Sequence, residues 1–421
     1  MSVEGKDYPR STLKYKVITM LRRIVMGMIL GLLLITAGGC SDGGNDNSQA
    51  PAGAGTAPDT VTQEAPPPAI EAAPAGAAIE TDCSPSGDLQ YICGPENAED
   101  ILQVDDSEWL ITSGMNGARW GTDTPGHLYL VNHQSRAWEV LFPGDQPVLE
   151  QDQTLFPNCP APLNVNNFSG HGLALREQSP GQYLLYVTSH GDREAIEAFR
   201  LDAGGGKPVV KWIGCVALPN TVWPNSVAIL ADGGFVTSKF MDPTDPEGFN
   251  KVRQQVITGG VYEWHPGGGA PTEIEGTQLS GANGILVSPD ERYLYVAAFG
   301  SNEVVRFDRS GTPLQRTAAA MAVTPDNLRW TAAGMIYTTG GDHMPPADCP
   351  QQPCGSGWSV FEIDPGTMTA NRVTGVDAGV TMQGASSALR VGEQIWIGTY
   401  AGDRIGILPL PETPSEVSTE P

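Results

Sequence analysis

The sequence has few charged residues and few basic ones in particular. Only 17% of its 421 residues are charged, and 24 Lys and Arg stand against 48 Asp and Glu. A net charge of −24 makes the chain a poor candidate for binding nucleic acid. The low share of charge, set against 51 Gly and 35 Pro, disfavours long surface helices and favours short elements joined by turns. The composition therefore favours an all-β protein.

Several common catalytic motifs are also absent from the sequence. It contains no H-E-x-x-H zinc motif and no P-loop. Its match to G-x-S-x-G, GCSDG at 39–43, lies at the end of the N-terminal apolar segment and not on a strand-to-helix turn, so it is not a nucleophile elbow. The glycine triplets at 204–206 and 267–269 follow expected strands and are better explained as turns than as phosphate-binding loops. The sequence thus gives no sign of a serine hydrolase, a zinc protease or a P-loop enzyme.

The apolar run near the N-terminus, Ile24–Ile35, is short for a membrane span. Lys14, Lys16, Arg22 and Arg23 precede it, and small residues at 37–39 lead directly to Cys40. This segment resembles a bacterial lipoprotein signal, which implies removal of residues 1–39 and a lipid on Cys40. An uncleaved membrane anchor is the alternative, and both interpretations place the remainder outside the cytoplasm.

Two details qualify the resemblance to a lipoprotein signal. Ala37 stands where that signal usually has Leu, and Ser41 follows the cysteine in place of Asp. By resemblance to the sorting rule, Ser41 favours the outer membrane, on its periplasmic or its surface face. We therefore expect an exported protein whose only contact with the membrane is the lipid anchor.

Residues 40–82 and 411–421 have the composition of unfolded segments. The first is Gly, Ala, Pro, Ser and Thr with scattered acids and almost no large apolar side chains, so it cannot bury enough surface to fold. It is expected to be a tether, and the last eleven residues a disordered tail. Removal of residues 1–39 takes away six basic and two acidic residues, which makes the net charge −28. The folded domain is predicted over residues 83–410.

Six cysteines besides Cys40 suit disulfides in an exported chain. Six cysteines allow fifteen sets of pairings, and a zinc site is a further alternative, although the last two cysteines have no second ligand pair close in sequence. The set that we favour is Cys83–Cys93, Cys159–Cys215 and Cys349–Cys354.

Six segments of the chain repeat one pattern. Each begins with a polar residue and continues as an apolar strand, a turn and a second β-rich strand, as in DILQVDDSEWLIT after Glu99. In five units an aromatic or branched residue lies ten positions after the first polar residue, and most units continue into a third strand. The first residues of the units are Glu99, His171, Asn225, Asn283, Asp326 and, more doubtfully, Ser386.

Short β-units of this kind are typical of the blades of a propeller. We therefore predict an all-β, six-bladed β-propeller, with a long β-sandwich as the alternative. The innermost strand of each blade runs beside the central axis, so one position per blade can point to the same place. The repeated polar residues are expected to converge there.

The converging side chains suit a hard cation. Two carboxylates and two amides without thiolates or a histidine cage favour Ca²⁺ over Mg²⁺. Each of these residues alone is more simply explained as a turn residue that bonds to the local backbone. Because four of them share one register, the sequence predicts a central metal site.

The same residues resemble the paraoxonase/arylesterase family in order and spacing. The matching pieces are Glu99-Asp100, FSGHGLAL around His171, LLYVTS before His190, LPNTVWPNSVAIL around Asn225, SGANGILVSPDERYLYVAA around Asn283, and TPDNLRW around Asp326-Asn327. Wider relatives are the gluconolactonase-like and strictosidine-synthase-like propellers. The resemblance covers about residues 99–410, and the ordered set is more specific than any single piece.

The resemblance implies a catalytic Ca²⁺ held by Glu99, Asn225, Asn283, Asp326 and Asn327. It also implies a second, structural Ca²⁺ at Asp100. At that second site the chain departs from the family, because Ser226 stands where the family has Asp. The second ion is therefore doubtful.

His171 and His190 match the histidine pair of the family. One imidazole near a metal-polarised carbonyl can deprotonate a water molecule while the other orients it, although a lone His is more often structural. Trp223 either lines the pocket or packs in the core, which is its more ordinary role. The segment 241–255 is either a lid or a surface loop.

The expected function is calcium-dependent hydrolysis of a small lactone or aryl ester. The competing interpretations are a non-catalytic, calcium-braced propeller that binds a ligand or partner, and a condensation like that of the strictosidine-synthase-like relatives. The sequence determines neither the substrate nor the oligomeric state.

Overall fold

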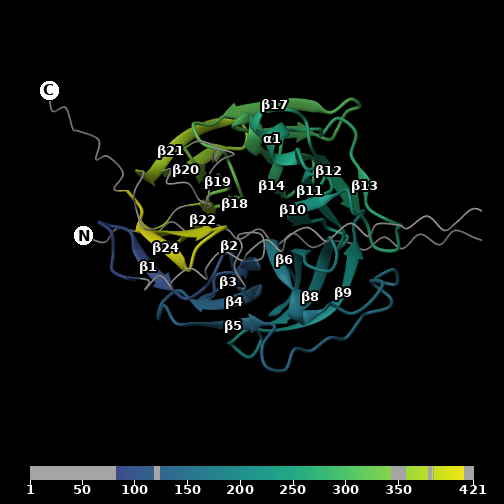
Figure 1. Cartoon of the computed structure of the whole chain (residues 1–421), viewed down its shortest axis with the longest axis horizontal. Coiled ribbons are helices and arrows are strands. Elements are labelled where there is room, and N and C mark those ends of the chain that lie inside the picture. Colours follow the sequence, from purple (N-terminus) through teal and green to yellow (C-terminus); the bar gives the residue numbers. More distant parts are fainter. Residues whose placement is uncertain (1–81, 118–123, 343–356, 378–381, 383, 412–421) are drawn as a thin grey trace, which may run out of the picture. The chain divides into compact units, whose positions relative to one another are not determined.

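A computed structural model of the chain describes residues 82–117, 124–342, 357–377, 382 and 384–411. They belong to one compact unit, Gly76–Pro421. In the described part of the chain the strands form six antiparallel four-stranded sheets that follow one another around a ring (Figure 1). We number the sheets one to six in chain order.

Each sheet begins with an inner strand and ends at an outer edge. Sheet one consists of β2 (Ala98–Gln103), β3 (Trp109–Gly114), β4 (His127–Asn132) and β5 (Trp138–Phe142), and sheet two of β6 (Ser169–Ser179), β7 (Gln182–His190), β8 (Ala195–Asp202) and β9 (Val209–Ala217). Sheet three consists of β10 (Trp223–Ile229), β11 (Phe235–Met241), β12 (Gly260–Trp264) and β13 (Thr272–Glu273). Sheet four consists of β14 (Ala282–Val287), β15 (Tyr293–Ala298), β16 (Glu303–Asp308) and β17 (Gln315–Ala320).

The remaining two sheets complete the ring. Sheet five consists of β18 (Leu328–Trp330), β19 (Ile336–Gly341), β20 (Trp358–Asp364) and β21 (Thr369–Val376), and sheet six of β22 (Ala385–Val391), β23 (Gln394–Thr399), β24 (Arg404–Pro409) and β1 (Gln90–Cys93). Within the residues that the structure describes, three short helices lie between strands, namely η2 (Val165–Asn167), α1 (Gly248–Arg253) and η3 (Phe299–Ser301).

The six inner strands close a ring. Each of β2, β6, β10, β14, β18 and β22 contacts the next, and β22 contacts β2. Apolar side chains pack between neighbouring sheets, as where Trp396 and Ile405 of sheet six meet Ile101 and Leu110 of sheet one. The predicted six-bladed propeller is confirmed, and its blades have four strands each where the repeats indicated three.

Sheet six joins the two ends of the described domain. Its outer strand β1 comes from the N-terminal side and pairs antiparallel with β24, with Gln90 opposite Ile407 and Cys93 opposite Arg404. Because the first and last strands share one sheet, hydrogen bonds between them close the ring.

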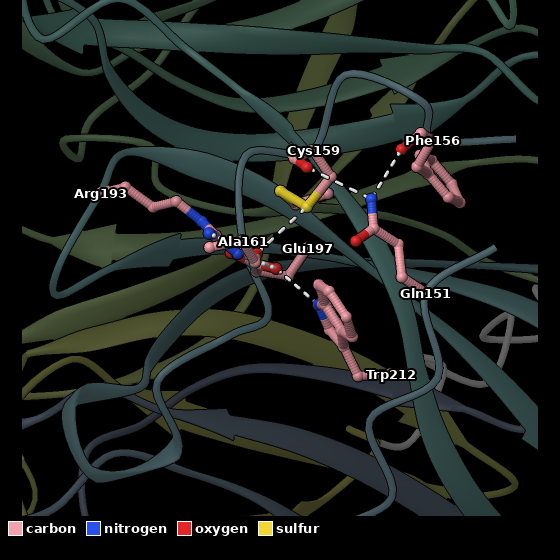
Figure 2. Close-up of a disulfide and its surroundings, with 8 residues drawn as sticks. Gln151, Phe156, Cys159, Ala161, Arg193, Glu197 and Trp212 are labelled. Atoms are coloured by element: carbon pink, nitrogen blue, oxygen red, sulfur yellow. Dashed lines mark hydrogen bonds and ion pairs between the residues drawn. A yellow bond between two sulfur atoms is a disulfide. The ribbon is translucent and has the colours of Figure 1, made fainter. Parts of the chain in front are cut away.

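Two of the three favoured disulfides are present, Cys83–Cys93 and Cys159–Cys215. The second fixes the long connection between sheets one and two onto β9. Figure 2 shows Gln151 donating to the carbonyls of Phe156 and Cys159 beside it. Disulfides indicate an oxidising compartment, in agreement with export.

A buried ion pair supports the same connection. Arg193 makes two hydrogen bonds to Glu197 and one to the carbonyl of Ala161, and the indole of Trp212 donates to Glu197 at 2.7 Å (Figure 2). Burial raises the pKa of Glu197, and Arg193 opposes that shift. The pair therefore links the long connection to strands β8 and β9.

Removal of the Cys159–Cys215 disulfide by substitution of both residues with Ser should lower the free energy of unfolding by about 4 kcal/mol. This bond spans 56 residues, whereas Cys83–Cys93 spans ten, so the matched double substitution there should cost only about 3 kcal/mol. Urea unfolding measures both. A larger loss from the shorter loop would contradict this loop-entropy argument.

Several predictions fall on residues outside the described part of the chain. These are Cys40, Cys349 and Cys354, the signal segment 1–39, and almost all of the tether and the tail. The lipid anchor, the third disulfide and the domain boundaries stay predictions. Within the described residues, no helix has the length and apolar character needed to cross a membrane.

Candidate functional site

The repeated polar residues lie at a repeated irregularity of the inner strands. In β2, β6, β10 and β14 two residues oppose one on the partner strand, at 99–100, 171–172, 225–226 and 283–284. Such a β-bulge leaves backbone groups unpaired and redirects side chains. Hydroxyl groups opposite the bulges bind the freed groups, as where Ser113 Oγ accepts from Asp100 N–H at 3.1 Å and Ser238 Oγ from Ser226 N–H at 3.1 Å. In these four blades the bulge therefore accounts for the redirected side chains of Glu99, His171, Asn225 and Asn283.

Glycine follows His171 and Asn283, at two places where neighbouring inner strands approach closely. A Cβ on Gly172 would lie 2.5 Å from the Cα of Ser226, and one on Gly284 would lie 2.4 Å from the carbonyl oxygen of Asp326. Substitution of either glycine would push neighbouring blades apart. Close approach therefore brings the functional side chains of successive blades together.

Five of the predicted ligands present a buried side-chain oxygen without a partner. In the described part of the chain, ten buried side-chain N or O atoms lack a hydrogen-bond partner, and five of them belong to these residues. We call them the five unpartnered oxygens: Glu99 Oε2, Asn225 Oδ1, Asn283 Oδ1, Asp326 Oδ1 and Asn327 Oδ1.

Direct contacts connect members of this set. Asn327 Nδ2 donates to Glu99 Oε1 at 2.6 Å, although the two residues lie on sheets five and one. Asn283 donates to the carboxylate of Asp326. Each of the two carboxylates, Glu99 and Asp326, thus has its second oxygen held by an amide of the same set.

The energetic cost of five unpartnered oxygens is large. Each buried polar group without a partner costs about 1–3 kcal/mol, so five cost an amount on the order of the whole stability of a domain. Water could hydrogen-bond the amide oxygens but would not offset the repulsion between Glu99 and Asp326. Burial raises the pKa of Asp326 well above its ordinary value, and the charge of Glu99 raises it further. A cation would both bind the unpartnered oxygens and offset the repulsion between the two carboxylates.

These residues fit Ca²⁺ by the chemistry of the donor set, which consists of two carboxylates and three amides. Among the described residues no three His, Cys, Asp or Glu side chains form a group able to hold a metal ion. A site here would therefore depend on its amide oxygens as much as on its acids.

The two predicted histidines are in contact with each other and with this set. His171 Nδ1 lies 2.9 Å from His190 Nε2, and His171 Nε2 lies 3.6 Å from Glu99 Oε1. His171 belongs to the bulge of β6, and His190 ends the neighbouring strand β7. His171 is therefore placed between the ligand candidates and the second imidazole.

A cavity of about 320 Å³ lies on the other side of His190. Such a volume is at the lower end of the range for small-molecule sites. Its wall combines apolar and polar side chains: Met115, Asn116, Ser169, His190, Glu194, Trp223, Met241 and Pro243. The histidine pair connects this cavity to the five unpartnered oxygens.

Trp223 lines the cavity and packs in an aromatic cluster at the same time. Its ring meets Phe240 at 5.6 Å and Phe249 at 5.9 Å between centroids, and its indole Nε1 lies 2.8 Å from His190 Nδ1. Phe249 belongs to α1, so the segment 241–255 packs against the cavity wall, and its Met241 and Pro243 line the cavity.

Asp100, the residue expected at a second ion, has a guanidinium as its neighbour. Its carboxylate is fully buried and forms an ion pair with Arg329. It also accepts from Leu173 N–H at 2.8 Å, while Arg329 donates to the carbonyl of Ile101 at 2.8 Å. A guanidinium thus supplies the positive charge that the resemblance assigned to a structural Ca²⁺, and this contact joins sheets one, two and five.

Ser386, the doubtful sixth member, has a different role. Its Oγ donates to the carbonyl oxygen of Glu99 at 2.6 Å, and its own carbonyl accepts from Asn327 N–H at 2.9 Å. Ser386 therefore positions two ligand candidates through their backbones.

Two residues of the site were not found from the sequence. Glu194 Oε2 lies 2.6 Å from His190 Nδ1. Burial raises the pKa of Tyr400, and the charge of Asp326 raises it further, which places this phenol near the ligand candidates. Tyr400 follows the second strand of its sheet, as Met115 does in sheet one, so a search at the ends of second strands could have found it.

No protein-family model matches the chain, and no curated protein matches it. Many solved structures are similar in fold, including the following three. A gluconolactonase from Xanthomonas campestris is 19% identical, with 77% of this chain and 89% of that chain covered and a TM-score of 0.47. A putative gluconolactonase is 17% identical (78% and 94% covered, TM-score 0.44). Virginiamycin B lyase from Staphylococcus aureus is 12% identical (77% and 99% covered, TM-score 0.43). At these values the activity has to be argued from the chain's own residues.

Proposed function

We propose that the chain is a calcium-dependent hydrolase of lactones or aryl esters. The observation that carries the proposal is the set of five unpartnered oxygens next to a pair of histidines in mutual contact. Glu99, Asn225, Asn283, Asp326 and Asn327 would hold the ion. A bound Ca²⁺ would act as a Lewis acid that polarises the substrate carbonyl and stabilises negative charge on its oxygen.

The histidines supply the proton transfers. His171 removes a proton from water as the water oxygen attacks the carbonyl carbon, and His190 orients the imidazole of His171. When the carbon–oxygen bond to the leaving group breaks, His171 returns the proton to the departing oxygen. The products are a carboxylic acid and a phenol from an aryl ester, or a single hydroxy acid from a lactone. This route needs no nucleophile from the protein.

The cavity beside His190 is the proposed substrate site. Its walls offer an indole and two methionines for apolar groups and the side chains of Asn116 and Ser169 for hydrogen bonds. The net charge of −24 disfavours an anionic substrate. A small neutral ester or lactone suits this combination of apolar and hydrogen-bonding groups. We propose that the protein is exported, is tethered through Cys40 and acts on such molecules.

A metal analysis and an activity screen of the full chain in mild detergent test this proposal. We expect about one bound Ca²⁺ and hydrolysis of a phenyl ester and of a lactone. A calcium chelator should remove the activity, and added Ca²⁺ should restore it. Mg²⁺ added after chelation serves as the control and should restore little.

Two outcomes would contradict the proposal. Full activity after removal of calcium would exclude a catalytic role for the ion. A melting temperature that rises with Ca²⁺, without turnover of any ester or lactone, would instead favour the calcium-braced binding propeller.

A further inference from the structure

His190 Nδ1 has two neighbours with incompatible requirements. Glu194 Oε2 lies 2.6 Å away and Trp223 Nε1 lies 2.8 Å away. An ionised carboxylate can only accept a hydrogen bond, whereas an indole N–H can only donate one. Glu194 therefore requires a proton on His190 Nδ1, and Trp223 requires a lone pair there.

The choice between the two neighbours is transmitted to His171. With a proton on Nδ1, neutral His190 has its lone pair on Nε2, so His171 donates its Nδ1–H across the 2.9 Å contact. The lone pair of His171 is then on Nε2, which faces Glu99. If His190 instead carries its proton on Nε2, His190 donates the hydrogen bond to His171 Nδ1. His171 then carries its own proton on Nε2, where a base needs a lone pair.

We propose that Glu194 is a positioning residue that selects the productive tautomer of the His171–His190 pair against the competing hydrogen bond from Trp223. The consequence for turnover rests on the proposed hydrolase function, whereas the tautomer itself does not. Glu194 belongs to the cavity wall, and the proposed effect on the reaction passes through its contact with His190.

Charge decides the competition in favour of Glu194. A hydrogen bond to an ionised carboxylate is about twice as strong as one between neutral groups. Arg193, the adjacent cation, is turned away to Glu197, so it does not neutralise Glu194. The side chain of Glu194 is 20% exposed, and its backbone carbonyl accepts from Leu218 N–H at 2.9 Å, which anchors the residue at the start of β8.

The first test needs no variant. ¹⁵N spectra of the histidine-labelled full chain distinguish a protonated ring nitrogen from one with a lone pair. The proposal expects a proton on His190 Nδ1 and a lone pair on His190 Nε2. The opposite assignment in the unmodified protein would overturn it.

The second test uses Glu194→Met, which keeps the side-chain length and removes the acceptor. The proton of His190 should move to Nε2, and kcat should fall about 100-fold, with KM changed less than about twofold because the cavity wall keeps a side chain of similar size. Asp192→Asn is the matched control, since Asp192 lies in the same turn but accepts from Asn164 and Asn167. The control should leave both the spectrum and kcat unchanged.

The third test removes the competitor. Trp223→Phe should raise kcat in the Glu194→Met background several-fold, because no indole N–H then holds the wrong tautomer, and it should not raise kcat in the unmodified background. An equal effect in both backgrounds would show that the two residues are not coupled and would overturn the proposal. If the unmodified protein hydrolyses no ester or lactone, the proposed function fails, while the spectra still decide the role of Glu194.

Discussion

Glu99→Gln is expected to lower kcat/KM for ester and lactone hydrolysis by about three orders of magnitude. Gln keeps the length of the side chain and can still accept from Asn327 through its Oε1. What it removes is one of the two buried negative charges that would hold the cation. The activity loss should therefore follow the loss of calcium affinity, measured by titration of the chelated protein with Ca²⁺.

The same variant should change the stability of the calcium-free protein in the opposite direction. Without an ion, the carboxylate of Glu99 repels that of Asp326 and raises its pKa. A neutral amide removes this repulsion, so the melting temperature in chelator should rise by a few degrees. Added Ca²⁺ should raise the melting temperature of the unmodified protein. It should not raise the melting temperature of the variant.

Glu393→Gln provides a matched control for Glu99→Gln. Glu393 lies in a turn of sheet six, and its side chain is 87% exposed. The control should leave activity, calcium affinity and melting temperature unchanged. A Glu99→Gln protein that keeps its activity, or that still gains stability from Ca²⁺, would exclude Glu99 as a ligand.

Arg329→Met is expected to lower the free energy of unfolding by about 3–5 kcal/mol. Burial raises the pKa of Asp100 to about 7, and the guanidinium of Arg329 opposes that shift. Loss of Arg329 would leave the buried carboxylate without its cation, or force it to take up a proton. It would also break the bonds to the carbonyls of Ile101 and Leu173, which lie on two other sheets.

Urea unfolding of three variants, each compared with the unmodified protein, tests this prediction. Arg390→Met is the control, because Arg390 is 40% exposed and pairs with a surface glutamate, a contact worth at most about 1 kcal/mol. The double variant Asp100→Asn/Arg329→Met should recover part of the lost stability, since an amide needs no counter-charge. Equal losses for Arg329→Met and Arg390→Met would contradict a structural role for the buried pair.

Much of the propeller could be predicted because each blade repeats the same local pattern. The inner strand, the turn and the second strand are apolar and regularly spaced, as from Glu99 to Trp109. The outer strands were missed because their side chains are exposed and mixed in character. For example, β13 is two exposed residues, and β17 reads QRTAAA with only one buried residue. An edge strand of this kind is defined by its pairing partner more than by its own sequence.

The candidate site, like the propeller, was predictable only where its residues follow the repeat. Glu99, Asn225, Asn283 and Asp326 share one register of the repeat, so the chain alone indicates that they converge. Glu194 carries no such signal, because it lies in a turn after a second strand, outside the register that the first residues of the units share. Its role depends on the position of His190, which only the folded sheet defines.

Glu99 and Asp100 show most clearly which features depend on the sequence alone and which depend on the tertiary structure. The sequence by itself determined that six units each present a polar residue to a common axis, because this follows from strand periodicity and the spacing of the turns. Only the tertiary structure decided that Asp100 pairs with Arg329, 229 residues away in the chain, and that Asn327 holds Glu99 from the opposite half. Closure of the ring brings these residues together, and which buried charge meets which partner depends on the stacking of whole blades.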